Sequence, residues 1–356
     1  MFKKDIPYNK LPLLPWNFDY DNKDLLKLAL KANSSLAKLN WLSLLIPNVD
    51  ILISPLLVKE SVESNAIENI NTTTLKVLQE EALDKNKLSW PEKEVSHYRK
   101  SLLSWINKIK KQGWIWYNLL LELQSIIEPN KTWVRKIPWT VIANNFWEIL
   151  YTPPVWEEVI NKLLKNLEDF MNNSLDDIDP LIKMPVIHYQ FESIHPFYDW
   201  NWRTWRILNI VYLMLSKKLD YPVLFLSEYI NKTRTTYYKL FDKTRKSWDF
   251  SNFIEYMLNW IIIQSEKTWK KILKINKLME KTSNQIEELN LDYYKIAKLL
   301  FSKPFISVWE FSKDMWFSRQ AWTRYISLLE NKEIISSIKV WRNKLIFVKD
   351  FIKLLD

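Results

Sequence analysis

The sequence has almost no glycine and no cysteine. Its 356 residues include a single glycine, Gly113, whereas an average content of about 7% would give roughly 25. Without cysteine the chain has no disulfide bonds and no thiolate metal sites, which fits the reducing cytoplasm. No apolar run approaches the roughly 20 residues of a membrane span, and the first residues lack the apolar core of a signal peptide. We therefore expect a globular cytoplasmic protein with no membrane segment.

The charge is positive but dispersed. Hydrophobic residues make up 47% of the chain and charged residues 26%, which is ordinary for a globular protein. The net charge is +10, yet the lysines are scattered and acidic residues are plentiful. This pattern predicts a solvated, lysine-rich surface, so nucleic-acid binding has to be argued from local features.

Tryptophan is as abundant as glycine is scarce. The twenty tryptophans and one glycine together come close to the glycine number of an average chain. Several tryptophans, among them Trp90, Trp139 and Trp341, stand where turns are expected, and turns favour the positive φ angles that glycine adopts without steric cost. We hypothesise that most of them are glycine in the living protein, in a bacterium that reads UGA as glycine. The Lys-, Asn- and Ile-rich composition suits an AT-rich genome of that kind. The alternative is that the tryptophans are real.

Residue types used in catalysis are concentrated in residues 194–206. This stretch contains one of only three histidines, an acid, an amide and two arginines, and an apolar run long enough for a buried helix follows it. His195 is a candidate base and Asp199 a hard oxygen ligand. Arg203 and Arg206 are spaced i and i+3, so both can face one phosphorylated ligand. The stretch has no cysteine or serine nucleophile.

These residues suggest a polyphosphate held with Mg²⁺ at a helix N-terminus, since Mg²⁺ prefers carboxylate and phosphate oxygens. A histidine beside such a site suits general-base activation of an incoming hydroxyl. The expected chemistry is therefore transfer of a phosphorus-containing group by positioning and electrostatics.

Residues 195–206 resemble the Fic-domain signature H-P-F-x-D/E-G-N-G-R-x-x-R at every position but two, where Trp200 and Trp202 replace glycine. The resemblance implies a protein adenylyltransferase that transfers AMP from ATP to a Ser, Thr or Tyr hydroxyl of a target protein. It makes His195 the base, Asp199 the Mg²⁺ ligand, and Phe197 the anchor of the loop in the core. It assigns ATP binding to Trp200, Asn201, Trp202, Arg203, Thr204, Trp205 and Arg206, and less specifically to Tyr229 and Tyr237 on the adenine side. Arg203 would hold the β-phosphate and Arg206 the γ-phosphate. Literal indoles at 200 and 202 would block the phosphates.

A second motif lies at the end of a helix expected over residues 54–69, for which Ser54-Pro55 is the predicted start. Ser64, Glu68 and Asn69 match the Fic inhibitory motif S/T-x-x-x-E-G/N, and Ser64 and Glu68 share a helix face. By itself the motif fits a helix with a polar face and an asparagine cap. Beside the signature, it implies an autoinhibited enzyme in which Glu68 pairs with Arg206. In some members of the family this glutamate instead supports removal of AMP.

The remaining pattern predicts a mainly α protein. Helical periodicity begins at Asp24, and further helices are expected over 72–81, 92–110, 119–127, 157–172 and 180–194. A β-hairpin within 138–154 corresponds to the flap that in Fic proteins pairs with the target backbone. Helices over 250–280 are expected to close the core, and the charged stretch 266–290 to act as a connector. His188 is expected to be a packed histidine, because no third metal ligand is near it.

Residues 292–348 resemble a winged helix: helices over 292–301 and 308–313, a helix-turn-helix near 315–325, and a hairpin of 334–340 with 344–348. Arg319, Arg324, Lys339, Arg342 and Lys344 are placed to meet phosphates, although winged helices also serve as protein-interaction modules. We expect three domains: an N-terminal helical region (1–105) with the inhibitory helix, a Fic core (106–275), and a connector with the winged helix (276–356).

Two other functions remain open. One is a DNA-binding regulator with a degenerate Fic domain, which real tryptophans at 200 and 202 would favour. The other is an enzyme that transfers another nucleotide or a phosphate. Self-modification and a homodimer are compatible with the sequence, which does not identify the target protein.

The recoding hypothesis predicts the mass of the native protein. If UGA is read as glycine, the intact mass will be lower than that of the printed sequence by one tryptophan-to-glycine difference for every recoded position. Mass spectrometry of protein purified from its own organism measures this, and peptide sequencing across residues 194–206 identifies the residues at 200 and 202. A mass that accounts for twenty tryptophans would refute the hypothesis.

Overall fold

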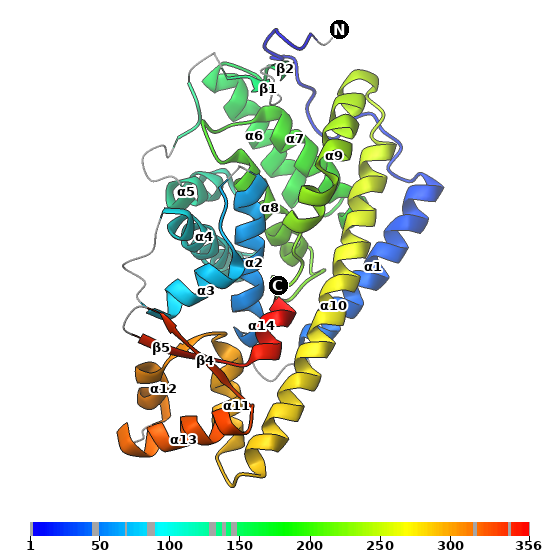
Figure 1. Cartoon of the computed structure of the whole chain (residues 1–356). Helices are drawn as coiled ribbons and strands as arrows, with labels where there is room; N and C mark the ends of the chain where they lie inside the picture. The colour runs from blue at the N-terminus through cyan, green and yellow to red at the C-terminus, as the bar shows by residue number, and fades with distance from the viewer. Residues whose placement is uncertain are drawn as a thin grey trace. The chain divides into compact units, whose positions relative to one another are not determined.

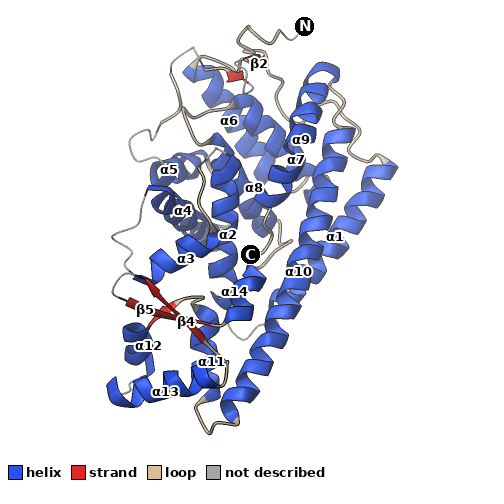
Figure 2. Ribbon diagram, in the orientation of Figure 1, coloured by secondary structure: helices blue, strands red, loops and turns tan. Residues whose placement is uncertain are grey.

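The computed structural model describes residues 3–44, 50–67, 70–83, 90–127, 133–136, 140–143, 148–315, 319–340 and 343–355. These residues form fourteen α-helices and five short strands, so the protein is mainly α, as predicted (Figures 1 and 2). None of the described helices is long and apolar enough to cross a membrane.

The chain forms two compact units that are interleaved in the sequence. Unit 1 comprises residues 1–37 and 97–265, and unit 2 comprises residues 38–96 and 266–356. This division differs from the three consecutive domains expected from the sequence. The reason is that residues 38–96 make their tertiary contacts with the C-terminal quarter: α2 (Asp50–Ile67) contacts α11 (Tyr293–Ser302) and α14 (Lys349–Leu355). The composition along the chain does not indicate that residues 38–96 pack against the C-terminal quarter.

Unit 1 is built around two buried helices, α7 (Pro180–Ile194) and α8 (Asn201–Leu215), which pack against each other (Figure 1). Asp179 caps α7, since its carboxylate accepts a hydrogen bond from the Leu181 N–H at 2.7 Å, and Pro180 occupies the first turn. Nearly every side chain of α7 is buried, because α6 (Glu157–Asn172) covers it as well as α8. The bounds of α6 and α7 are those predicted.

The other helices of unit 1 begin within two residues of the predicted starts, except α9, which was not predicted. They are α1 (Lys23–Leu44), which begins in this unit, α4 (Trp90–Gln112), which begins in unit 2, α5 (Tyr117–Ile127), α9 (Ser227–Ser247) and α10 (Ser251–Glu287). The last was expected as several helices and a connector, and this was wrong: α10 is one helix of 37 residues that contributes to both units. Its charged half has no helix-breaking residue, so the helical hydrogen bonding continues.

The predicted hairpin before the signature is present. β1 (Ile142–Ala143) pairs antiparallel with β2 (Ile149–Tyr151), with Ile142 opposite Tyr151. Its tip, including Trp147, lies outside the described residues. The Tyr151 ring is fully buried, and its hydroxyl donates a hydrogen bond to the Ser193 carbonyl at 2.7 Å. The hairpin is thereby fastened to the end of α7.

Unit 2 begins with α2, whose predicted start was wrong. The helix begins at Asp50, four residues before Ser54, and Pro55 lies inside it. A proline inside a helix removes one backbone hydrogen bond and crowds the preceding turn, and apolar packing of Ile53, Leu56 and Leu57 offsets this cost. Ser64 is fully buried near the end of α2. Glu68 and Asn69, the other two residues of the proposed inhibitory motif, lie outside the described residues.

The C-terminal part of unit 2 has the predicted helices and hairpin in order, and in addition the strand β3, which was not predicted. After α3 (Thr74–Leu83) and α11 come β3 (Ile306–Ser307), α12 (Val308–Met315), α13 (Arg319–Asn331), β4 (Ser336–Val340) and β5 (Asn343–Phe347). The strands form one antiparallel sheet in the order β3-β5-β4. Trp316, Trp341 and Arg342 lie outside the described residues, as does the side chain of Arg319.

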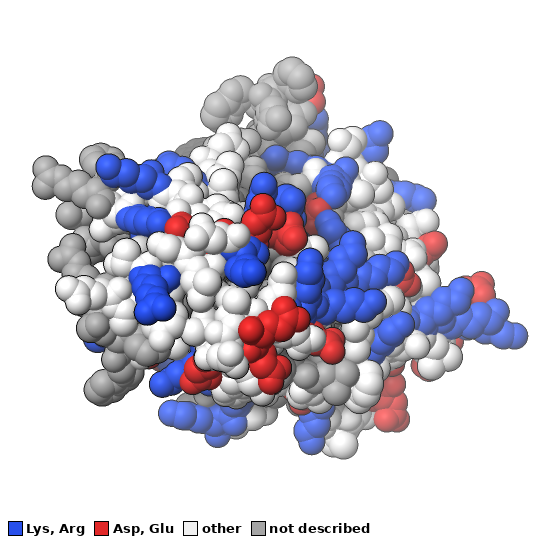
Figure 3. All heavy atoms as spheres, turned by 60° about the horizontal axis from the view of Figure 1, so that its bottom comes forward, with Lys and Arg blue, Asp and Glu red and all other residues white. Residues whose placement is uncertain are grey.

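The surface agrees with the dispersed charge of the sequence. On the face drawn in Figure 3, lysine and arginine side chains are numerous, but aspartate and glutamate side chains lie among them. Lys344, for example, forms a salt bridge with Glu330 at 2.8 Å. The view therefore supports a mixed, solvated surface on this face.

Candidate active site

The candidate site is the loop that joins α7 to α8. His195 ends α7 in a left-handed conformation (φ 46°, ψ 62°), and its N–H donates to the Phe191 carbonyl at 2.9 Å. A left-handed backbone costs a non-glycine residue roughly 1–2 kcal/mol, so neighbouring contacts have to hold it. The His195 side chain is 13% exposed, which leaves its ring within reach of a ligand.

Arg135 supplies those contacts. Its guanidinium is fully buried and donates from Nε to the His195 carbonyl at 2.7 Å and from Nη2 to the carbonyls of Ile194, at 3.2 Å, and Pro154. Its own backbone N–H bonds the Pro196 carbonyl at 2.9 Å. The last carbonyls of a helix lack partners within the helix and form the negative end of its dipole, so a buried cation is well suited to this position. Burial lowers the pKa of Arg135 to about 10, which keeps it charged at neutral pH.

The middle of the loop closes on itself. The Asn201 side chain accepts a hydrogen bond from the Phe197 N–H at 2.9 Å and donates to the Phe197 carbonyl at 2.8 Å. Phe197 is fully buried, which agrees with its expected role as the anchor of the loop. Asn201 was expected to cradle phosphates; in the structure its amide is instead used to fix the loop.

Beyond this clamp, the loop turns into α8. Asp199 is exposed just before the helix, and its carbonyl accepts a hydrogen bond from Gln124 Nε2 of α5 at 3.2 Å. The Thr204 hydroxyl bonds the Trp200 carbonyl at 3.1 Å, and so does the Arg203 N–H. The first N–H groups of α8 thus lie beside an exposed carboxylate, at an end that favours anions.

The two signature arginines, Arg203 and Arg206, lie in the first two turns of α8. Arg203 and Arg206 are both fully buried on α8, as their i and i+3 spacing predicts for side chains directed to one region. The Arg203 guanidinium lies 3.5 Å from the centre of the Trp200 ring. The Trp200 indole therefore covers the arginine expected to hold the β-phosphate.

The tryptophans at 200 and 205 lie in environments that are unfavourable for an indole side chain. Trp200 adopts φ 65° and ψ 17°, the left-handed region that favours glycine. Trp205 is fully buried, and among the described residues its indole N–H has no hydrogen-bond acceptor, although buried indoles usually find one. Elsewhere, Trp248 also has a positive φ of 56°. Five described tryptophans are more than half exposed: Trp41, Trp114, Trp133, Trp156 and Trp309.

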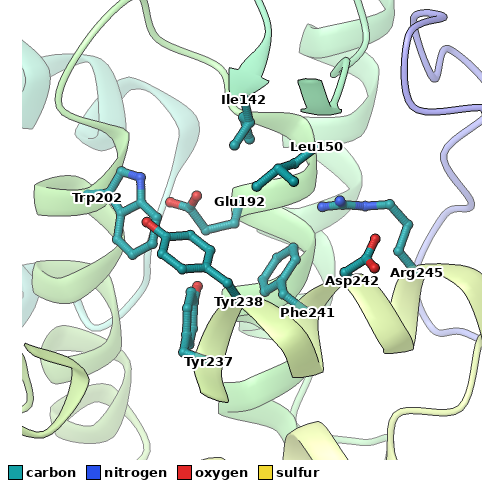
Figure 4. Close-up of a pocket in the computed structure, with 9 residues that line it drawn as sticks. All are labelled: Ile142, Leu150, Glu192, Trp202, Tyr237, Tyr238, Phe241, Asp242 and Arg245. Carbon is teal, nitrogen blue, oxygen red and sulfur yellow. The ribbon is translucent and has the colours of Figure 1, made fainter. Parts of the chain in front are cut away.

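A small pocket opens beside the loop, between the hairpin, α7, α8 and α9 (Figure 4). Trp202 projects into it, with its ring 5.5 Å from that of Tyr237 and 5.6 Å from that of Tyr238. Two of the lining side chains are acidic and one is basic. The lining residues are Ile142, Leu150, Glu192, Trp202, Tyr237, Tyr238, Phe241, Asp242 and Arg245.

The two tyrosines predicted for the adenine side differ in position. Tyr237 lines the pocket, but it is almost completely buried and its hydroxyl is 2.8 Å from His188 Nε2. Tyr229 is not among the lining residues; its ring packs against Tyr256 and Trp260 instead. His188 is fully buried, as expected of a packed histidine, and burial lowers its pKa well below the usual value.

Sequence reasoning missed four residues that the fold brings to this region: Gln124, Arg135, Glu192 and Tyr238. Glu192 was detectable, because it is three residues before His195 and so one helical turn away. Tyr238 is adjacent to a predicted residue. Gln124 and Arg135 are more than fifty positions from the signature, and only folding reveals that they bind it.

Two family models match the chain. The model for the N-terminal part of the Fic/DOC family covers residues 26–104, and that for the Fic/DOC family covers residues 123–213, which include α7, the loop and nearly all of α8. The chain is a Fic-domain protein. Among curated proteins, the protein adenylyltransferase fic-1 of Caenorhabditis elegans is 35% identical over 86 residues, or 24% of this chain. That match spans only 16% of the C. elegans protein.

Solved structures share the fold of this Fic-domain protein. A Fic family protein from Desulfovibrio desulfuricans has a TM-score of 0.58 at 16% identity, covering 94% of this chain and 98% of the other. Fic-1 from C. elegans has a TM-score of 0.51 at 20% identity, covering 71% of this chain and 74% of the other. A Fic-domain signalling protein from Bacteroides thetaiotaomicron has a TM-score of 0.54 at 18% identity, covering 67% of this chain and 96% of the other.

The Arg135 contacts predict a large effect on stability. In Arg135→Met, several buried carbonyls at the end of α7 lose their donor, so the free energy of unfolding should fall by about 3 kcal/mol. Equilibrium urea denaturation measures it. Lys136→Met is the matched control, since Lys136 is exposed and pairs with Glu157 at the surface; it should change stability by less than about 0.5 kcal/mol. Equal urea midpoints for the two variants would show that Arg135 does not hold the loop.

Proposed function

We propose that this Fic-domain protein transfers AMP from ATP to a Ser, Thr or Tyr hydroxyl of a target protein in the cytoplasm. The observation that carries the proposal is the arrangement of one loop. His195 ends α7 with a partly accessible ring, the exposed Asp199 precedes the N-terminus of α8, and Arg203 and Arg206 lie on that helix. Similarity over part of the chain to a protein adenylyltransferase supports it.

In the proposed step, the His195 imidazole accepts the proton of the target hydroxyl. The hydroxyl oxygen forms a bond to the α-phosphorus of ATP, and the bond from that phosphorus to the oxygen bridging to the β-phosphorus breaks. The products are the AMP-modified protein and pyrophosphate, and the proton remains on His195 until it passes to solvent. The arginines and the α8 N-terminus supply positive potential where negative charge develops on the phosphates.

The residues fit Mg²⁺ only in the company of ATP. Among the described residues no group of three or more His, Cys, Asp and Glu side chains could hold a metal ion by itself. Mg²⁺ in nucleotide sites is held through one or two carboxylates plus phosphate oxygens, and the exposed Asp199 supplies one carboxylate at the right end of α8. When bound, the ion would neutralise charge on the phosphates. Asp199 would hold it, while Thr204 and Asn201 keep the loop in shape.

The pocket beside the loop is the proposed adenosine site. Four of its nine lining residues are aromatic, and Tyr238 presents a partly exposed ring that an adenine can stack on. Tyr237 supports this wall from behind, since its hydroxyl is engaged by His188. Tyr229 is not part of the proposed site, because it does not line the pocket. The hairpin that supplies Ile142 and Leu150 would receive the target backbone.

The proposal requires small residues at 200 and 202, and we therefore retain glycine as the residue in the living protein. Trp200 covers Arg203 and carries a left-handed backbone, and Trp202 projects into the pocket. Glycine at both positions relieves the strained φ and opens the approach to the arginine and to the α8 N–H groups.

Autoinhibition by Ser64, Glu68 and Asn69 is also proposed from the motif. Ser64 is buried on α2, which fits a packed helix face. In the resting enzyme Glu68 would pair with Arg206 and so deprive the γ-phosphate of its partner. Removal of AMP by the same glutamate is a further proposal that follows from the motif.

The test uses the full chain with glycine at 200 and 202 and with Glu68→Gly. Incubated with Mg²⁺ and ATP labelled at the α-phosphate, it should label itself or a protein added from an extract. His195→Ala in the same background should lose this label by at least about 10²-fold, because a general base contributes that much or more. Label from γ-phosphate but not from α-phosphate would indicate phosphate transfer, and no label from either would overturn the proposal.

A second candidate function rests on the C-terminal elements of unit 2. The order α11-β3-α12-α13-β4-β5, with one sheet in the order β3-β5-β4, supports the winged helix expected from the sequence. Gln320, Thr323 and Arg324 are exposed on α13, the helix that would enter a DNA groove, and Lys339 is exposed on the hairpin. A DNA-binding regulator with an inactive Fic domain would have this arrangement.

This alternative is tested with the protein that carries tryptophan at 200 and 202. Its binding to a random-sequence DNA duplex is measured by fluorescence anisotropy over a range of salt concentrations. A steep decrease in affinity with salt, reduced by Arg324→Ala, would favour the regulator. Affinity too weak to measure at low salt would exclude it.

A further inference from the structure

A buried carboxylate lies beside the proposed base and has no role in the mechanism so far. Glu192 is in the last turn of α7, and its side chain is only 4% exposed. Its Oε2 is 3.7 Å from Nδ1 of His195. Within the described part of the chain, both Glu192 Oε1 and His195 Nδ1 are buried without a hydrogen-bond partner.

An arrangement of this kind is costly if it does nothing. A buried ionised carboxylate needs donors to offset its desolvation. The other deeply buried charged residue of α7, Lys183, shows how a buried charge is usually compensated by partners of its own. Its Nζ donates to the Asn173 carbonyl and to Asp176, both at 2.5 Å. Glu192 has no comparable ligand for Oε1 among the described residues. Its carboxylate instead points into the pocket toward Trp202 and Tyr238 (Figure 4).

The charged groups around the pair come from several elements. Arg135 binds the backbone carbonyl of His195. Asp242 and Arg245 of α9 line the same pocket as Glu192. Burial and, in addition, Arg206 of α8 lower the pKa of His188, whereas burial and, in addition, Glu192 raise the pKa of Tyr237. Glu192 is the acidic residue whose carboxylate lies 3.7 Å from the His195 ring.

We propose that Glu192 is a positioning residue for His195: it keeps the proton of the neutral ring on Nδ1, leaves Nε2 free as the base, and stabilises the imidazolium that forms when Nε2 takes up the hydroxyl proton. The inference deepens the proposed function and rests on it. The 3.7 Å separation is longer than a hydrogen bond, but the two residues are one helical turn apart and a small side-chain rotation brings the two atoms together. Catalytic hydrogen bonds are often long without substrate and shorten when it binds.

The state of the ring can be measured without any enzymatic activity. The chain has three histidines, so long-range ¹⁵N–¹H spectra of histidine-labelled protein contain three ring systems. His188 is an internal reference with the opposite tautomer, because its Nδ1 accepts from Asn209 Nδ2 and its Nε2 faces the Tyr237 hydroxyl. Its lowered pKa keeps it neutral over the working range. His97 is identified with His97→Gln.

The experiment uses the full chain with glycine at 200 and 202, together with three substitutions at 192. We expect His195 to carry its proton on Nδ1. In Glu192→Gln the acceptor remains but the charge is lost, so the tautomer should persist and the midpoint of the ring titration should fall. In Glu192→Leu the Nδ1–H preference should be lost as well. Glu192→Asp, which restores the charge, should recover part of the midpoint shift. Unchanged His188 signals report that each variant is folded.

Glu168→Gln provides the matched control, since Glu168 is a nearly buried carboxylate of α6 that bonds the Tyr117 N–H and Lys165. It should leave the His195 titration unchanged. A His195 ring protonated on Nε2, or a midpoint in Glu192→Gln equal to that of the parent, would overturn the inference whatever the transfer assay shows.

The transfer assay then separates the two proposals. With Glu68→Gly added, Glu192→Gln should label at least about tenfold more slowly, and the acidic limb of its pH–rate profile should move to lower pH, because its base loses a proton more readily and is weaker. An equal decrease at every pH would indicate a structural role and overturn the inference. If the parent shows no AMP transfer while the ring behaves as expected, the proposed function fails and the assignment of Glu192 to His195 stands.

Discussion

One buried cation holds the candidate site together. Helix α7 ends among buried residues of unit 1, where its last carbonyls cannot reach water. Those carbonyls therefore need hydrogen-bond donors from the surrounding protein. Tyr151 satisfies the Ser193 carbonyl, and Arg135 satisfies those of Ile194 and His195. The loop that follows can then turn in a left-handed conformation at His195. Without these donors, neither the position of His195 nor the start of α8 would be fixed.

The same contacts connect the hairpin to the site. Tyr151 belongs to β2 and Arg135 lies in the segment that precedes β1, so the residues that satisfy α7 are those that carry the hairpin. Arg135 also binds the Pro154 carbonyl just after the hairpin. Because the hairpin is fastened at both ends to the region around His195, its strands stay in place beside the pocket. In a Fic-type mechanism this would align a target's backbone with the base.

The opposite wall of the site shows how the backbone turns where the Fic signature has glycine and this sequence has tryptophan. The backbone at 200 takes a left-handed turn because the Asn201 side chain draws the loop back to Phe197 before α8 can begin. The indole at 200 is therefore both attached to a left-handed backbone and placed over Arg203. The composition and the backbone thus point to glycine for independent reasons: one is a count over the whole chain, the other a dihedral angle at one residue.

The sequence by itself determined the helical class, the bounds of α6 and α7, the hairpin, and the motif with His195, Asp199, Arg203 and Arg206. All of these depend on near neighbours: helical periodicity, capping residues and a contiguous loop. Tertiary structure alone decided what depends on residues far apart in the chain. It joined residues 38–96 to the C-terminal quarter, brought Arg135 and Gln124 to the loop, placed Tyr238 rather than Tyr229 in the pocket, and used Asn201 to clamp Phe197. The physical reason is that a buried carbonyl or carboxylate must be satisfied by whatever the fold brings within about 3 Å of it, and spacing in the sequence does not encode that distance.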